Sequence, residues 1–227
     1  MRHNPTDLLA AGLAALEAEA QRRSNYKIQR YFPDCTSRCR PASSKTERHK
    51  NEDGTQRYCR SLYPKHLAFM NDGAEHRERL MMAGNRIGKS DLGAYETALH
   101  LTGLYPHWWK GRRFDEAVTW WGSGDTGKTT RNIIQLKLLG PPSDIGSGFI
   151  PRHLLVHRTK KSGVADAFDT VWVKHSSGGM SMLEFKSYDQ RREGFQGTAQ
   201  HGIWLDEEPP MDIYTECVLR TMKTSDF

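Results

Sequence analysis

The chain has 227 residues, which suffices for one α/β domain with a buried core and a modest extension but not for two large catalytic domains. Its formal net charge of +6 and pI near 9.2 mildly favour a polyanionic partner. No apolar run approaches the roughly 18 residues that a membrane helix needs, and the N-terminus lacks a signal-peptide pattern. The composition therefore predicts a soluble intracellular protein with no membrane contact.

The first part of the chain is a helix followed by a basic polar stretch. Residues 6–23 repeat leucines such as Leu9, Leu13 and Leu16 at helical spacing, which predicts an amphipathic helix packed on the domain surface, with a docking helix for another subunit as the alternative. Residues 34–60 show no apolar periodicity and are predicted to form a long loop. We therefore separate an extension, residues 1–62, from a domain, residues 63–227.

Three cysteines and a histidine lie in or beside this loop. Thiolates and an imidazole can form a tetrahedral zinc site, and the surrounding positive charge favours ionised thiols. The spacing matches no familiar zinc knuckle, so thiols without a metal in a surface loop are the alternative. The candidate ligands are Cys35, Cys39, His49 and Cys59.

Residues 63–103 predict a helix, a strand and a second helix. Tyr63-Pro64 opens the first helix, which ends at residues 71–73, and an apolar strand is expected at 79–83. The second helix begins near Ser90 and stops at Gly103. The aromatic turn that follows, Tyr-Pro-His-Trp-Trp, could stack on single-stranded nucleic acid, but such tryptophans more often plug a core.

The segment from Ala83 to Ser90 is the first of two candidate phosphate-binding loops. A triphosphate needs backbone N–H groups around a concavity, a lysine, a hydroxyl for magnesium and a helix N-terminus. Gly84, Gly88, Lys89 and Ser90 supply these groups. The usual pattern has glycine where this chain has Ala83.

The second candidate loop, Gly122 to Thr129, is the better match by pattern alone. The predicted strand 118–121 leads into it, and a helix carrying Ile133 and Ile134 follows. A GTPase interpretation fails, because no N-K-x-D motif appears downstream.

The last third of the chain predicts strands separated by loops. Residues 140–151 and 188–200 are expected to be loops, and 171–175 with 182–186 a β-hairpin or a pair of neighbouring strands, on either side of Ser177-Gly178-Gly179. Strand 202–205 ends in three acidic residues, Asp206, Glu207 and Glu208. In a P-loop ATPase the first would hold magnesium and the second would polarise the attacking water, while Glu208 would cap the next helix or pair with a base. An acidic turn without catalytic function is the alternative.

Several of these blocks together resemble the ATPase portion of the large subunit of tailed-bacteriophage terminases, the DNA-packaging motors. The blocks occur in the family's order and are specific only as a set. They are Tyr63-Pro64-Lys65-His66 with Phe69, residues 79–90, 101–109, 185–189, 195–197 and 204–210.

The resemblance favours the first loop over the second and assigns roles to particular residues. It implies that Arg86 contacts the γ-phosphate, that Glu207 activates water, that Ser90 and Asp206 hold Mg²⁺, and that an adenine-binding block precedes the loop. The adenine-binding residues would be Tyr63, Pro64 and Phe69, and the ATP-binding loop Gly84, Asn85, Arg86, Ile87, Gly88, Lys89 and Ser90.

The expected fold is an α/β P-loop NTPase of the ASCE type, with a mostly parallel twisted sheet flanked by helices. The resemblance implies ATP-driven translocation of double-stranded DNA in the host cytoplasm, by a homo-oligomeric ring with portal and small terminase subunit as partners. A helicase-like ATPase and an inactive fragment are the alternatives. The family's coupling strand and nuclease domain are expected to be missing, so no nuclease activity is expected. Residues 110–113 and Arg191-Arg192 could grip DNA or be ordinary solvated surface.

Overall fold

The computed structural model describes residues 12–16, 26–34 and 59–222, which fall into two compact units, Met1–Leu62 and Tyr63–Phe227. In the first unit residues 12–16 are helical, α2 spans Lys27–Arg30 and a 3₁₀ turn spans Arg60–Leu62. The rest of the predicted helix 6–23 and most of loop 34–60 lie outside the described residues. In the described part of the chain, no helix has the length and apolar character to cross a membrane.

Of the four proposed zinc ligands, only Cys59 lies within the described residues. Its side chain is buried, and its thiol lies 3.9 Å from the Asp34 carbonyl oxygen. Cys35, Cys39 and His49 lie outside the described residues. The zinc site therefore stays a prediction.

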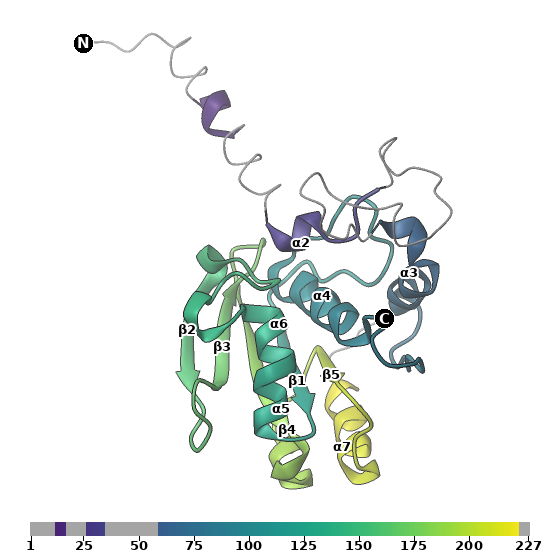
Figure 1. The fold of residues 1–227 in the computed structure, drawn as a ribbon, viewed down its shortest axis with the longest axis vertical. Helices are drawn as coiled ribbons and strands as arrows, with labels where there is room; N and C mark the ends of the chain where they lie inside the picture. Colours follow the sequence, from purple (N-terminus) through teal and green to yellow (C-terminus); the bar gives the residue numbers. More distant parts are fainter. Residues whose placement is uncertain (1–11, 17–25, 35–58, 223–227) are drawn as a thin grey trace, which may run out of the picture. The chain divides into compact units, whose positions relative to one another are not determined.

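The second unit is built on a five-stranded sheet with the order β2-β3-β4-β1-β5 (Figure 1). The parallel pairs are β1 with β4 and β1 with β5, whereas β2, β3 and β4 pair antiparallel. The expectation of a mostly parallel sheet is therefore corrected to a mixed sheet. The strands are β1 (Thr119–Gly124), β2 (Leu155–Lys160), β3 (Phe168–Lys174), β4 (Met180–Ser187) and β5 (Gly202–Leu205).

The mixed sheet arises because three consecutive strands are joined by short connections. The predicted hairpin is confirmed, since β3 and β4 pair antiparallel across the turn after Lys174. A short connection cannot carry the chain back to the other end of the sheet, so strands joined in this way must run antiparallel. Strand β2 was not predicted, because its sequence Leu-Val-His-Arg-Thr-Lys is mostly polar and exposed.

The strand predicted at 79–83 is wrong, because these residues belong to no strand. Leu80 and Met82, the apolar residues behind the prediction, are 82% and 84% exposed. An extended segment becomes a strand only when a neighbour pairs with its backbone. Within the described residues, no strand of the sheet pairs with 79–83.

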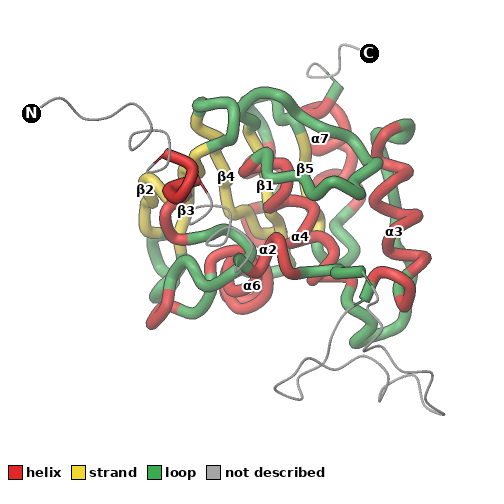
Figure 2. Tube along the Cα trace, turned by 90° about the horizontal axis from the view of Figure 1, so that it is seen from above, coloured by secondary structure: helices red, strands yellow, loops and turns green. Residues whose placement is uncertain are grey.

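Helices cover both faces of the sheet, as the end-on view shows (Figure 2). Helix α4 packs against β1, β3, β4 and α6 on one face of the sheet. Helix α7 contacts β5 on the side of the opposite face. Successive residues of β1 point to opposite faces of the sheet. Trp120 packs on His100 of α4, and Trp121 packs on Phe195. The helices are α3 (Pro64–Asn71), α4 (Lys89–Thr102), α5 (Gly127–Thr130), α6 (Leu136–Leu139) and α7 (Met211–Thr221), with a π-helical turn Arg131–Gln135 joining α5 to α6.

Helix α4 ends where the sequence predicted. Gly103 follows it with φ of 68°, a left-handed conformation that glycine adopts without strain, and its N–H bonds the Leu99 carbonyl. The aromatic turn after it is core structure, since Trp109 is 4% exposed and donates its indole N–H to the Arg112 carbonyl. The alternative that this turn stacks on single-stranded nucleic acid therefore lacks support.

A buried ion network ties α4 to the segment that precedes the first glycine loop. Glu96 is 6% exposed, and its carboxylate lies 2.8 Å from Arg79 and 3.5 Å from His100. Burial alone would raise the pKa of Glu96, but hydrogen bonds and charges of His100 and Arg79 outweigh it and hold the pKa below its usual value. Arg79 also donates to the Phe69 carbonyl, so α3 shares the network.

Replacing Glu96 by alanine is expected to lower the free energy of unfolding by about 3 kcal/mol at neutral pH, because the guanidinium of Arg79 and the ring of His100 lose their carboxylate partner. A depressed folded-state pKa stabilises the protein above the unfolded-state pKa, and this contribution disappears as the pH falls through the folded-state value. Urea unfolding at neutral and acidic pH should show the difference from the parent shrinking in acid. The exposed Glu193→Ala is the control, and an equal loss there would contradict the role of Glu96.

Candidate functional site

The carboxyl ends of three neighbouring strands meet at one edge of the sheet. Strands β4, β1 and β5 are adjacent and parallel, so the residues that follow Ser187, Gly124 and Leu205 lie together. The strand-end acids Asp206 and Glu207 are among them. Ligand sites of parallel α/β sheets form at this edge.

Asp206 lies close to the first glycine loop in the fold, although the two are far apart in the sequence. The residue is 7% exposed, and the Ser90 side chain lies close enough to its carboxylate to lower the pKa of Asp206. Burial raises the pKa of Asp206, and the Ser90 side chain and the charges of Lys137 and Lys89 oppose that rise. The fold therefore brings a hydroxyl, a carboxylate and an ammonium group into one place.

The first glycine loop leads directly into α4. Arg86 and Gly88 adopt left-handed backbone conformations, with φ of 62° and 90°. Lys89 reaches back and donates from Nζ to the Ala83 carbonyl at 2.8 Å. Gly88 is the N-cap of the 14-residue α4 and brings no side chain to cap it. The loop thus presents an uncapped helix N-terminus beside a lysine, a combination suited to anions.

Helix α3 supports this loop through a residue that sequence reasoning did not single out. His66 Nε2 donates to the Ile87 carbonyl at 3.0 Å, and burial lowers the pKa of His66, which favours the neutral ring. Tyr63 packs edge-on against the His66 ring with centroids 5.2 Å apart. The only sequence signal for His66 was its place in the Tyr-Pro-Lys-His block.

The other two residues of the proposed adenine block lie on α3 as well. Pro64 is its first residue and is exposed. Phe69 is partly buried, with the guanidinium carbon of Arg79 4.7 Å from its ring centroid. One face of Phe69 is therefore already covered by a cation.

The second glycine loop uses its own backbone N–H groups internally. Thr126 and Thr129 form a reciprocal cap, each accepting the backbone N–H of the other. The Gly127 N–H points to the Asp189 carboxylate at 3.4 Å. A phosphate would have to displace these acceptors, so the regular sequence pattern here is that of a self-capped helix start.

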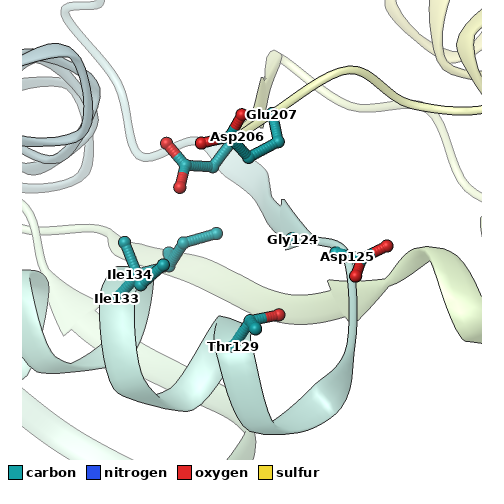
Figure 3. A pocket seen from close by; sticks show the side chains of 7 residues that line it. All are labelled: Gly124, Asp125, Thr129, Ile133, Ile134, Asp206 and Glu207. Carbon is teal, nitrogen blue, oxygen red and sulfur yellow. The ribbon is translucent and has the colours of Figure 1, made fainter. Parts of the chain in front are cut away.

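A small cavity separates the second loop from the strand-end acids (Figure 3). Its volume is about 190 Å³, below the roughly 300 Å³ at which ligand pockets usually begin. In Figure 3 Asp206 and Glu207 lie across from the helix that carries Ile133 and Ile134. The cavity borders the acids, and none of its lining residues comes from the first loop.

The basic residues proposed as DNA grips are partly engaged within the protein. Arg192 pairs with Glu216 at 3.0 Å, and the guanidinium carbons of Arg112 and Arg113 lie 5.1 Å from the ring centroids of Phe114 and Tyr105 respectively. Lys110 and Arg191 are exposed. These contacts favour the solvated-surface interpretation for Arg112, Arg113 and Arg192.

Comparison with known proteins shows what kind of protein this mixed α/β sheet belongs to. Residues 80–226 match the family model for the N-terminal part of terminase large subunits of the T4likevirus type. The chain is also 38% identical over 185 residues to the terminase large subunit of Salmonella phage P22. The chain therefore belongs to the terminase large subunit family, which confirms the resemblance found in the sequence.

The match to the P22 protein covers 73% of this chain but only 37% of that relative. The chain thus spans little more than a third of its relative's length. No solved structure matches it.

Proposed function

We propose that this chain is a magnesium-dependent ATP hydrolase that drives double-stranded DNA into a capsid. The observation that carries the proposal is the proximity of Ser90 and Lys89 to the carboxylate of Asp206, since both act on its pKa. A glycine loop at a helix N-terminus and an acidic strand end are the two halves of a P-loop ATPase site, and the fold brings them together.

The donor set fits magnesium, because a serine hydroxyl and a carboxylate are hard oxygen ligands. Ser90 and Asp206 would hold the ion, which when bound neutralises charge on the phosphates. Lys89 would release the Ala83 carbonyl and bind the β- and γ-phosphate oxygens. Arg86 would stabilise charge on the γ-phosphoryl group, as an arginine finger in cis does.

Glu207 is proposed to orient and polarise the attacking water. It follows Asp206 directly, and its exposed side chain lines the cavity. An exposed carboxylate can reach a water molecule in line with a phosphate held by the loop. Glu208 is exposed too, and the N-cap of α7 is Pro210 with no side-chain cap, so the expectation that Glu208 caps this helix is wrong.

The nucleotide base is proposed to lie near α3. His66 links that helix to the loop at Ile87, so a base placed by the loop would meet the Tyr63 end of α3. Tyr63 offers a ring for stacking, and Pro64 and Phe69 are proposed as further apolar contacts.

Movement of DNA is proposed from family membership, together with portal and small terminase subunit as partners and a homo-oligomeric ring in the host cytoplasm. Phosphate contacts by lysine and arginine would make binding to DNA salt-dependent. Of the proposed grips, Lys110 and Arg191 are the exposed residues most accessible to a duplex.

The test is the release of phosphate from ATP by the purified chain, with and without duplex DNA. Turnover is expected with Mg²⁺ and is expected to fall to background when EDTA removes the ion, because Ser90 and Asp206 then hold no ion against the phosphates. Addition of excess Mg²⁺ after EDTA should restore turnover. Turnover that persists in EDTA would contradict the proposed metal site.

Two further readouts separate this function from the alternatives. Stimulation by portal or procapsid supports a packaging motor, whereas a helicase-like ATPase would respond to nucleic acid alone. Absence of both ATP binding and turnover in the chain would leave an inactive fragment and would overturn the proposal.

A further inference from the structure

Tyr188 occupies a buried position directly behind the strand-end acids. It is the first residue after β4, and its side chain is 6% exposed. Its ring packs at 6.4 Å from that of Phe195 within a cluster that includes Trp121 and Ile213. Packing holds the ring of such an enclosed tyrosine in one orientation, and this fixes the position of its hydroxyl oxygen.

The Tyr188 hydroxyl points to the backbone of both acids. It lies 3.1 Å from the Asp206 carbonyl oxygen and 3.2 Å from the Glu207 carbonyl oxygen, and it donates to them. One O–H is thus shared between the two peptide groups that flank Glu207. No other described side chain is hydrogen-bonded to both of these carbonyls.

Glu207 has a backbone conformation that needs such support. Its φ is 67°, in the left-handed region, which costs roughly 1–2 kcal/mol for a residue with a Cβ. Outliers of this kind persist where the surroundings hold them, and they concentrate at functional sites. The two carbonyls bonded by Tyr188 belong to the strained residue and to its predecessor.

We propose that Tyr188 is a positioning residue for hydrolysis, holding the left-handed turn that aims Glu207 at the attacking water while Asp206 faces Ser90. This inference rests on the proposed function, which assigns those roles to the two acids. Tyr188 itself touches no reacting atom. Without the hydroxyl, the turn can relax and Glu207 loses its fixed direction.

Burial and the nearby carboxylate of Asp206 raise the pKa of Tyr188 above its usual value. The hydroxyl therefore keeps its hydrogen throughout the pH range in which the enzyme would work. A donor is what two carbonyl oxygens require.

The test replaces Tyr188 by phenylalanine, which removes one oxygen and keeps the packed ring. We expect kcat for ATP to fall roughly 10- to 100-fold, as for other residues that orient catalytic ligands. The affinity for ATP should stay within about twofold, because the groups proposed to bind phosphate are untouched. Urea unfolding and circular dichroism verify that the variant is folded.

Tyr105→Phe is the matched control. Tyr105 is also a largely enclosed tyrosine with a bonded hydroxyl, which accepts the Phe114 N–H and meets His100 Nδ1, both at 2.9 Å. It lies in the aromatic turn away from the acids. Loss of its hydroxyl should lower stability without changing kcat.

Equal kcat for Tyr188→Phe and the parent would overturn the proposal, as would a loss of stability without a loss of turnover. Lys89→Ala in the same assay separates this failure from that of the proposed function, because turnover that survives Lys89→Ala means that the site itself is wrongly assigned.

Hydrogen–deuterium exchange tests the positioning role without turnover. Tyr188→Phe should speed exchange in residues 203–210, and Tyr105→Phe should not. Unchanged exchange there in Tyr188→Phe would overturn the proposal even in an inactive chain.

Discussion

Replacing Lys89 by alanine is expected to lower ATP hydrolysis at least about a hundredfold and to weaken nucleotide binding. An ammonium group aimed at developing phosphoryl charge in a partly enclosed site typically supplies about 3–4 kcal/mol of transition-state stabilisation. Lys89 begins α4 and lies close enough to Asp206 to influence its pKa. Phosphate release and the binding of a fluorescent ATP analogue measure the two effects.

Lys128→Ala is the control, because it removes the corresponding lysine from the second glycine loop. Lys128 is exposed, and the helix start that it belongs to is capped by Thr126. Turnover and binding should remain within about twofold of the parent. Loss of nucleotide binding in Lys128→Ala with Lys89→Ala unaffected would mean that the wrong loop has been assigned.

Replacing Glu207 by glutamine is expected to lower kcat by roughly 100- to 10,000-fold, the contribution of a general base, while ATP binding stays within a few-fold. The amide keeps the shape of the side chain but cannot accept a proton from water. Pre-steady-state phosphate release and equilibrium ATP binding separate the two effects.

Glu208→Gln removes the adjacent exposed carboxylate and should leave turnover close to that of the parent. A larger loss in Glu208→Gln than in Glu207→Gln would reverse the assignment of the general base. Loss of ATP binding in Glu207→Gln would instead indicate that this carboxylate helps to hold the metal.

Local patterns correctly predicted the elements that depend on their own residues. Helix α4 with its stop at Gly103 follows from helical apolar spacing and a glycine C-cap. Strand β5 was predicted with the bounds that it has, because its apolar run is closed by acids and prolines. The hairpin of β3 and β4 followed from two strand-like segments on each side of Ser177-Gly178-Gly179.

The elements that depend on distant partners were predicted wrongly. Strand β2 has a polar sequence and exists through its pairing with β3. Residues 79–83 have the apolar sequence of a strand but no strand neighbour among the described residues. A strand is a property of two segments, so a single segment's pattern can err in both directions.

The sequence by itself determined the family of this protein, the order of its candidate motifs and most of its helices, since these depend on nearby residues. The tertiary structure decided what pattern matching could not. It showed that the Gly127 N–H of the second glycine loop points to Asp189, that Ser90 lies close to Asp206, and that the Tyr188 hydroxyl donates to the carbonyls of Asp206 and Glu207. These are contacts between segments far apart in the chain, and folding alone creates them.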